Sequence, residues 1–342
     1  ILAAGIAIRW LIERGRRWKA VLVALAIWYA AGTLHTFPHF LVYFNELAGG
    51  PGGGNRYLDD SNIEWGESFY SLRRHLDNHG RERAKLEAFK PLPYSAFGLD
   101  LPSMNFRDVV WPEEDVTYYV GGSLLRRSSL SQEIPGVRFE WVGRYRPVDR
   151  IGGIFVYRFT TDPARKNDRD VFYVSRELWY GHAIRQAGSI LAGSPGYAEG
   201  KSVLADLHAD RGAWLQTQGD TRGAMISYLA AATGAPTDDP ALPLHRVRFA
   251  NAYLRYAATI PSIAPAASNA PPPEYLDALV HLREGDGGLG IASLVEAVRT
   301  RPDFTPAGQL LDQRLRHFGF PRLARATLEV PPDAAPPAGG SS

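Results

Sequence analysis

The chain has 342 residues, of which 45% are hydrophobic and 22% charged, and its formal net charge at pH 7 is +2. A charge so close to neutral argues against a nucleic-acid-binding protein, which normally carries a strongly basic surface. The sequence contains no cysteine, which excludes disulfides, thiolate metal sites and cysteine nucleophiles.

Residues 1–45 are expected to form the last transmembrane helices of a membrane protein, the first of them truncated. An apolar start is followed by the basic segment 9–19, predicted to be a cytoplasmic loop because basic residues between apolar runs are typical of that side. Segment 20–40 has no formally charged residue and supplies the roughly 20 apolar residues that a membrane helix needs. Residues after about 42 are then expected outside the cytoplasm. The alternative is a helical hairpin buried in a soluble protein.

His35 and His39 have the i,i+4 spacing of a metal-binding pair. No third ligand is evident and Pro38 lies between them. Aromatic side chains follow as far as Phe44, and such residues are enriched at membrane interfaces. An interfacial belt is therefore favoured over a metal site.

Residues 46–162 are expected to form a small α/β (α+β) domain, which would be extracytoplasmic. The stretch 61–80 predicts a helix, with Ser61 and Glu64 as a capping box and Gly80 at its end. Short apolar runs bounded by Pro and Gly predict strands. These runs are 85–89, 94–99, 116–122, 139–145 and 154–160.

Residues 163–326 predict an all-α, tetratricopeptide-like helical repeat, which begins with the polar linker 163–168. Small and large residues recur at repeat-like positions, and Pro236 and Pro302 lie 66 residues apart, close to two periods of a 34-residue repeat. These positions are Gly212, Leu215, Ala224, Tyr228, Ala231, Gly290, Leu294 and Ala297. Such repeats bind peptides on a concave surface, so a protein partner is expected there. The composition of the tail, 327–342, predicts disorder.

The stretch GGPGGGN (49–55) is rich in glycine but lacks the GKS or GKT ending of a phosphate-binding loop. A flexible hinge after the membrane helix is the favoured interpretation.

An acidic group follows the hinge, with Asp59, Asp60, Glu64 and Glu67 beside Trp65. Two carboxylates can share acid and base work when their surroundings separate their pKa values. Glu64 and Glu67 are one helical turn apart, and Trp65 offers an aromatic platform. The favoured alternative is that these glutamates stabilise a helix N-terminus. The five residues form a candidate supporting site, and no complete catalytic or metal-binding motif is recognised.

Two runs carry a family resemblance. PHFLVYFNELAGGP (38–51) and RYLDDSNIEWGESFYSLRRHLDNHG (56–80) resemble the C-terminal part of bacterial GT-C membrane glycosyltransferases, in the protein-mannosyltransferase and aminoarabinose-transferase-like group. RYRPVDRIGGIFVYRF (144–159) resembles the strand pair that often closes their outer domain. The likeness covers about residues 20–160. It departs at Glu67 and Ser68, where the family usually has Gln and then an acid, which puts a role for that pair in doubt.

The resemblance implies a transferase of the bacterial inner membrane that moves a sugar from a polyprenyl-phosphate donor to an extracytoplasmic acceptor. In that group the catalytic acids lie in the first extracytoplasmic loop, so they are expected upstream of residue 1, and the fragment alone is expected to be inactive. No cofactor is evident in this chain, and a divalent metal stays open for the parent protein.

The expected partners are the lipid bilayer, the lipid-linked sugar donor and a protein bound to the repeat. The alternative is a non-enzymatic, membrane-tethered repeat scaffold for envelope assembly.

Overall fold

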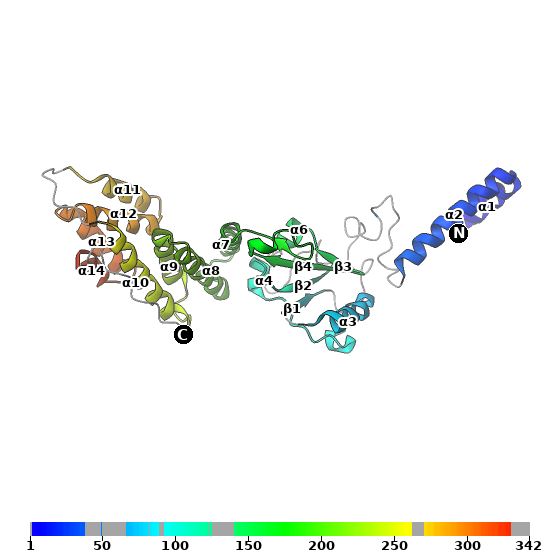
Figure 1. Cartoon of the computed structure of the whole chain (residues 1–342), viewed down its shortest axis with the longest axis horizontal. Coiled ribbons are helices and arrows are strands. Elements are labelled where there is room, and N and C mark those ends of the chain that lie inside the picture. Colours follow the sequence, from blue (N-terminus) through cyan, green and yellow to red (C-terminus); the bar gives the residue numbers. More distant parts are fainter. Residues whose placement is uncertain are drawn as a thin grey trace. The chain divides into compact units, whose positions relative to one another are not determined.

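The computed structural model is mostly helical with a small mixed sheet (Figure 1). It describes residues 2–37, 49, 66–81, 83–88, 92–122, 124, 140–261 and 270–329. Contacts divide the chain into two compact units, Ile1–Arg176 and Glu177–Ser342.

An N-terminal pair of helices opens the first unit, α1 (Leu2–Glu13) and α2 (Arg16–Thr36). Gly15, with φ of 111°, makes the turn between them, a conformation that favours glycine. The helices occupy most of the segment 9–19 that was predicted as a loop, because Arg and Lys are good helix formers. The 21 residues of α2 are long and apolar enough to cross a membrane.

A five-stranded sheet forms the centre of the α/β region. Its strands are β1 (Ala84–Glu87), β2 (Thr117–Gly121), β3 (Asp149–Ile151), β4 (Ile154–Thr160) and β5 (Phe172–Tyr173). The order is β1-β2-β4-β3, with β5 paired to β4; β1–β2 and β4–β5 are parallel, and the other pairs are antiparallel. Strands predicted near 85–89, 116–122 and 154–160 are confirmed, as is the strand pair within 144–159. Because β5 pairs with β4, the sheet extends beyond the predicted end at 162.

Helices cover both faces of this sheet, which explains why β4 is buried along nearly its whole length. On one face, Leu72 and Leu76 of α3 (Glu67–His79) share a core with Val156. On the other face, Trp141 of α6 (Glu140–Arg144) packs edge-on against Tyr157. Alternate residues of β4 therefore serve opposite cores.

Two predictions at the start of the domain are wrong. Helix α3 begins at Glu67 after Gly66, which has φ of 96°, and not at residue 61; the predicted capping pair lies outside the described residues. The predicted strand 94–99 contains the 3-10 helix η6 (Tyr94–Phe97). Gly98 ends η6 in the left-handed region, with φ of 69°, which turns the chain too tightly for a strand.

The predicted strand 139–145 is also wrong, because it contains helix α6. A short apolar run does not by itself distinguish a strand from a helical turn. Packing decides here: Trp141 is fully buried, and its indole N–H donates to the carbonyl of Asp108 at 2.7 Å. Asp108 lies in the short helix α4 (Phe106–Val110).

The segment predicted as a polar linker, 163–168, includes the 3-10 helix η7 (Pro163–Arg165). The second unit is built from helices. They are α7 (Arg176–Gly193), α8 (Ala198–Thr217), α9 (Thr221–Gly234), α10 (Leu242–Thr259), α11 (Pro273–Arg283), α12 (Gly287–Thr300), α13 (Thr305–His317) and α14 (Leu323–Glu329).

Two helical hairpins of this unit, α8/α9 and α11/α12, share the same turn. Asp220 and Asp286 each cap the second helix by accepting a backbone N–H through the side chain, at 2.8 Å in both cases. The preceding residues, Gly219 and Gly285, have φ of 79° and 85°. The 66-residue spacing read from the sequence therefore corresponds to two structurally similar hairpins.

Candidate functional site

Of the five predicted site residues, only Glu67 lies within the described part of the chain; Asp59, Asp60, Glu64 and Trp65 lie outside it. Glu67 is half-buried in the first turn of α3, where negative charge is favourable. Within the described ranges, no three His, Asp or Glu side chains gather in a way that could hold a metal ion.

Ser68, the next residue, has a structural contact that the sequence did not indicate. Its buried hydroxyl accepts a hydrogen bond from the backbone N–H of Gly153 at 2.8 Å. Gly153 lies in the turn between β3 and β4, so the start of α3 is joined to the strand pair 85 residues away. The start of α3 and the β3–β4 strand pair therefore meet in the fold.

A groove of about 800 Å³ lies beside α3 and the sheet, and it brings polar and apolar side chains of the described residues together. Its apolar lining comes from Ala84, Tyr119, Val148 and Val156. Its polar lining comes from His75, His79, Arg81, Asp149, Arg158, Arg169 and Asp170. Arginines outnumber carboxylates here, three to two, so the fixed charge of the lining is positive.

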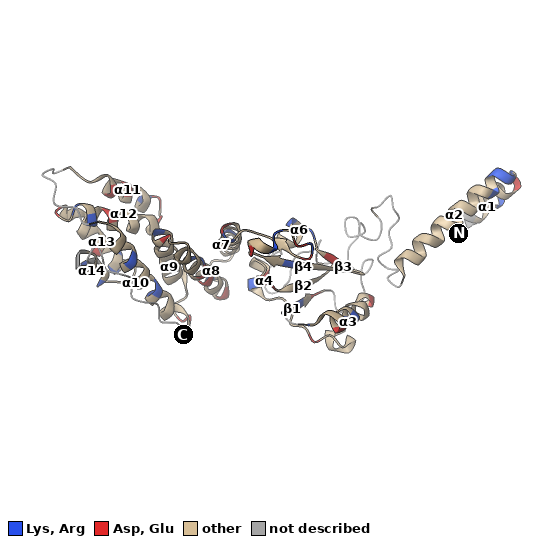
Figure 2. Cartoon of the chain, in the orientation of Figure 1, with Lys and Arg blue, Asp and Glu red and all other residues tan. Residues whose placement is uncertain are grey.

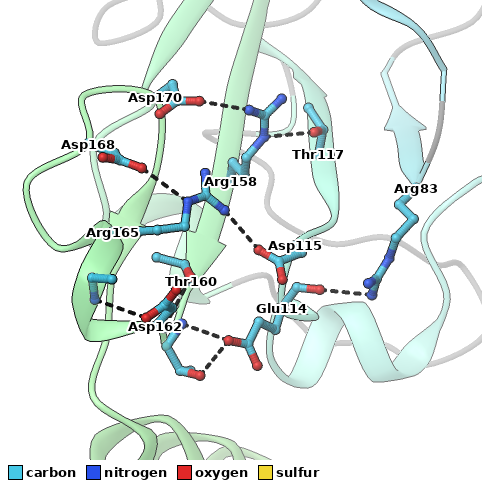
Figure 3. Close-up of polar contacts among 12 residues, drawn as sticks. Arg83, Glu114, Asp115, Thr117, Arg158, Thr160, Asp162, Arg165, Asp168 and Asp170 are labelled. Atoms are coloured by element: carbon cyan, nitrogen blue, oxygen red, sulfur yellow. Dashed lines mark hydrogen bonds and ion pairs between the residues drawn. The ribbon is translucent and has the colours of Figure 1, made fainter.

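Arg158 is the arginine that the fold holds most firmly. It lies on β4 directly opposite Thr117 of β2, and its Nε donates to the Thr117 hydroxyl at 3.0 Å. A terminal nitrogen of Arg158 forms an ion pair with Asp170, also at 3.0 Å (Figure 3). The guanidinium is therefore held from two sides before any ligand binds.

The loop after β4, which brings Arg169 and Asp170 to the groove, is tied down by a polar network (Figure 3). The carboxylate of Glu114 accepts hydrogen bonds from the backbone N–H and the hydroxyl of Thr161. Arg165 forms ion pairs with Asp115 at 3.2 Å and with Asp168 at 3.1 Å. The groove wall is thus held by several contacts.

The other two arginines differ in their surroundings. Arg81 donates to Asp77 at 2.7 Å and to the carbonyl of Gly98 at 3.2 Å. Arg169 is exposed and makes no hydrogen bond or ion pair to the described part of the protein. The charge of Arg169 is therefore the least compensated in the groove.

His75 and His79 are four residues apart on α3, and their rings stack with centroids 4.3 Å apart. His79 Nδ1 donates to the backbone carbonyl of His75 at 2.9 Å. Burial lowers the pKa of His75, and His79 and Arg158 lower it further, although Asp149 has the opposite effect. The lowered pKa of His75 favours its neutral form, so the proposed charge of the groove depends on its arginines.

A second charged cluster centres on Asp108, which is fully buried. Its two carboxylate oxygens accept from Lys85 Nζ at 2.8 Å each, from the Tyr118 hydroxyl at 2.7 Å and from the Asn105 backbone N–H at 2.7 Å. Burial and the charge of Asp108 raise the pKa of Tyr118, which keeps the phenol protonated as a donor. Lys85 also contacts Glu113 at 2.8 Å. The buried carboxylate of Asp108 has a partner for both oxygens, so we assign this cluster to stability.

The groove was missed by sequence reasoning because its arginines are far apart in the chain. One local signal was available: Arg158 is the only charged residue in the otherwise apolar strand IFVYRFT. A charge within a buried strand needs a partner or a ligand.

In comparisons with known proteins, no family model, curated protein or solved structure matches the chain.

Proposed function

We propose that this chain is the C-terminal portion of an integral-membrane glycosyltransferase. The enzyme would transfer a sugar from a polyprenyl-phosphate donor to an acceptor outside the cytoplasm of a bacterium. The observation that carries the proposal is α2, whose apolar side chains face outward: Ile27 is 64% exposed and Leu34 is 76% exposed. An apolar surface of this kind suits lipid better than water.

The charges near α2 support an orientation. Lys and Arg residues gather at the turn end of the α1/α2 pair (Figure 2). Basic residues beside a membrane helix favour the cytoplasmic side. The α/β region after α2 is then placed outside, in reach of a lipid-linked donor at the outer face.

The catalytic acids are proposed to lie upstream of this chain. The acids near residues 59–67 are proposed to support the site at the membrane face.

The orientation can be tested by single-cysteine labelling, since the chain has no native cysteine. Arg146→Cys, at an exposed position in the α/β region, is expected to react with a membrane-impermeant maleimide in spheroplasts. Arg14→Cys, at the turn between α1 and α2, is expected to react only after permeabilisation. The cysteine-free chain is the control. The reverse pattern, or labelling of both sites in intact spheroplasts, would contradict the proposal.

The enzymatic part is tested separately. Residues 1–342 expressed alone are expected to show no sugar transfer from a polyprenyl-phosphate donor, and measurable turnover would contradict the placement of the catalytic acids. Sequencing upstream of the chain is the positive test. About eight further apolar helices and an acidic pair in the first outer loop are expected of a transferase of this type.

The second candidate is a membrane-tethered scaffold without chemistry, and the hairpins α8/α9 and α11/α12 favour it. Their spacing supports a tetratricopeptide-like arrangement, and such repeats present a concave surface to protein partners. A short upstream region without further apolar helices would favour the scaffold over the transferase.

A further inference from the structure

We propose that the groove beside α3 binds the phosphate group of a small phosphorylated ligand. The inference is independent of the proposed transferase, because it concerns binding by residues of the α/β region and requires no sugar transfer.

Three arginines from different parts of the chain line this groove. Arg81 follows α3, Arg158 lies on β4, and Arg169 lies in the loop before β5. Guanidinium groups present donors in a planar fork that matches the oxygen atoms of a phosphate, and such charge-assisted bonds are among the stronger ones in proteins. A convergence of this kind suits an oxyanion better than a neutral ligand.

The carboxylates of the groove are compatible with this assignment. Asp170 holds the guanidinium of Arg158 in place at 3.0 Å and leaves the charge of Arg169 uncompensated. Asp149 is exposed and could accept a hydrogen bond from a ligand hydroxyl. The lining is thus preorganised, which reduces the cost of binding.

The apolar part of the lining indicates that the phosphate belongs to a larger molecule. Tyr119, Val148 and Val156 line the groove together with the arginines. A cavity of about 800 Å³ is far larger than a phosphate ion and is within the usual range for small-molecule sites. The remainder of the ligand could be a sugar or an aliphatic chain, and the experiment separates the two.

The test is isothermal titration of the purified 342-residue chain in detergent micelles, at pH 7.5 and low salt. The probes are inorganic phosphate, glucose 1-phosphate and hexyl phosphate. Saturable binding is expected for the phosphate esters, tighter than for inorganic phosphate. Tighter binding of glucose 1-phosphate would identify a sugar phosphate, and tighter binding of hexyl phosphate a lipid-type phosphate; either supports the proposal.

The decisive variant is Arg169→Gln, because Arg169 is exposed and its loss should not disturb the fold. It is expected to weaken binding of the preferred ester about tenfold, as for loss of a hydrogen bond to a charged group. Arg169→Lys keeps the charge but lacks the planar fork of donors. Its affinity for the ester is expected to lie between that of the unaltered chain and that of Arg169→Gln. Arg158→Gln is expected to weaken binding at least as much.

Arg74→Gln is the matched control, since Arg74 is exposed on α3 but does not line the groove. It is expected to bind like the unaltered chain. The proposal is overturned if no probe binds saturably, if Arg169→Gln binds unchanged, or if Arg74→Gln weakens binding as much as Arg169→Gln does.

Discussion

Replacing Asp108 by Asn is expected to destabilise the α/β region strongly. The carboxylate is fully buried and accepts four hydrogen bonds from three donor groups, those of Lys85, Tyr118 and Asn105. An amide of the same shape replaces one accepting oxygen with an N–H₂ group, which would face donors. It also removes one of the two negative charges that contact Lys85 at 2.8 Å, and the Lys85 side chain is only 15% exposed.

The magnitude follows from these contacts. Removing one partner of a buried ion pair typically costs 3–5 kcal/mol, because a buried charge is left uncompensated. Glu113 still contacts Lys85 at 2.8 Å, so the lower end applies, about 3 kcal/mol. Hydrogen exchange of peptides from β2 and β4 should therefore be about a hundredfold faster in Asp108→Asn.

Three comparisons make this test specific. Peptides from α9, in the other unit, should exchange as before. Asp312→Asn, which breaks an exposed ion pair with Arg316, should have little effect on either unit. Lys85→Met combined with Asp108→Asn should destabilise less than the sum of the single variants, because the two groups interact directly. Exchange in β2 within about threefold of the unaltered chain after Asp108→Asn would refute the reasoning, since about 3 kcal/mol is far larger.

Two further predictions concern the helical unit. Burial lowers the pKa of His208 to about 4, below its value of about 6.5 in the unfolded chain. Between these two pH values the unfolded chain therefore binds more protons than the folded chain. The free energy of unfolding is full above pH ~6.5 and falls by about 3 kcal/mol towards pH 4. His208→Gln should remove this part of the pH dependence of urea unfolding, and a variant whose pH dependence equals that of the unaltered chain would contradict the assignment. Gly290→Ala should lower the unfolding free energy by about 1–3 kcal/mol, because the added Cβ would lie 2.5 Å from a methyl carbon of Leu282. Gly188→Ala is the control: its added Cβ meets nothing within 4 Å, so it should raise the unfolding free energy by up to about 1 kcal/mol. If Gly290→Ala also raised the unfolding free energy in the same urea measurement, the contact with Leu282 would not be destabilising, which contradicts the prediction.

The features that the sequence predicted well depend on short stretches of chain. The part of helix α2 from residue 20 onward follows from a run without charged residues, and β4 follows from a strand-length, mostly apolar segment after a glycine pair. The turns of the hairpins α8/α9 and α11/α12 were not predicted, although their cause is also local: a glycine followed by a capping aspartate. In each case the physical cause lies within a few residues of the structure that it produces.

The groove and the helix α6 were decided by tertiary structure. Residues 139–145 have apolar side chains that suit a strand or a helical turn, and only the burial of Trp141 selects the helix. The arginines of the groove come from positions 81, 158 and 169, and their meeting depends on the β2–β4 register and on the loop held by Glu114. Local sequence determines which face of an element is apolar, whereas the packing of distant elements determines which polar groups meet.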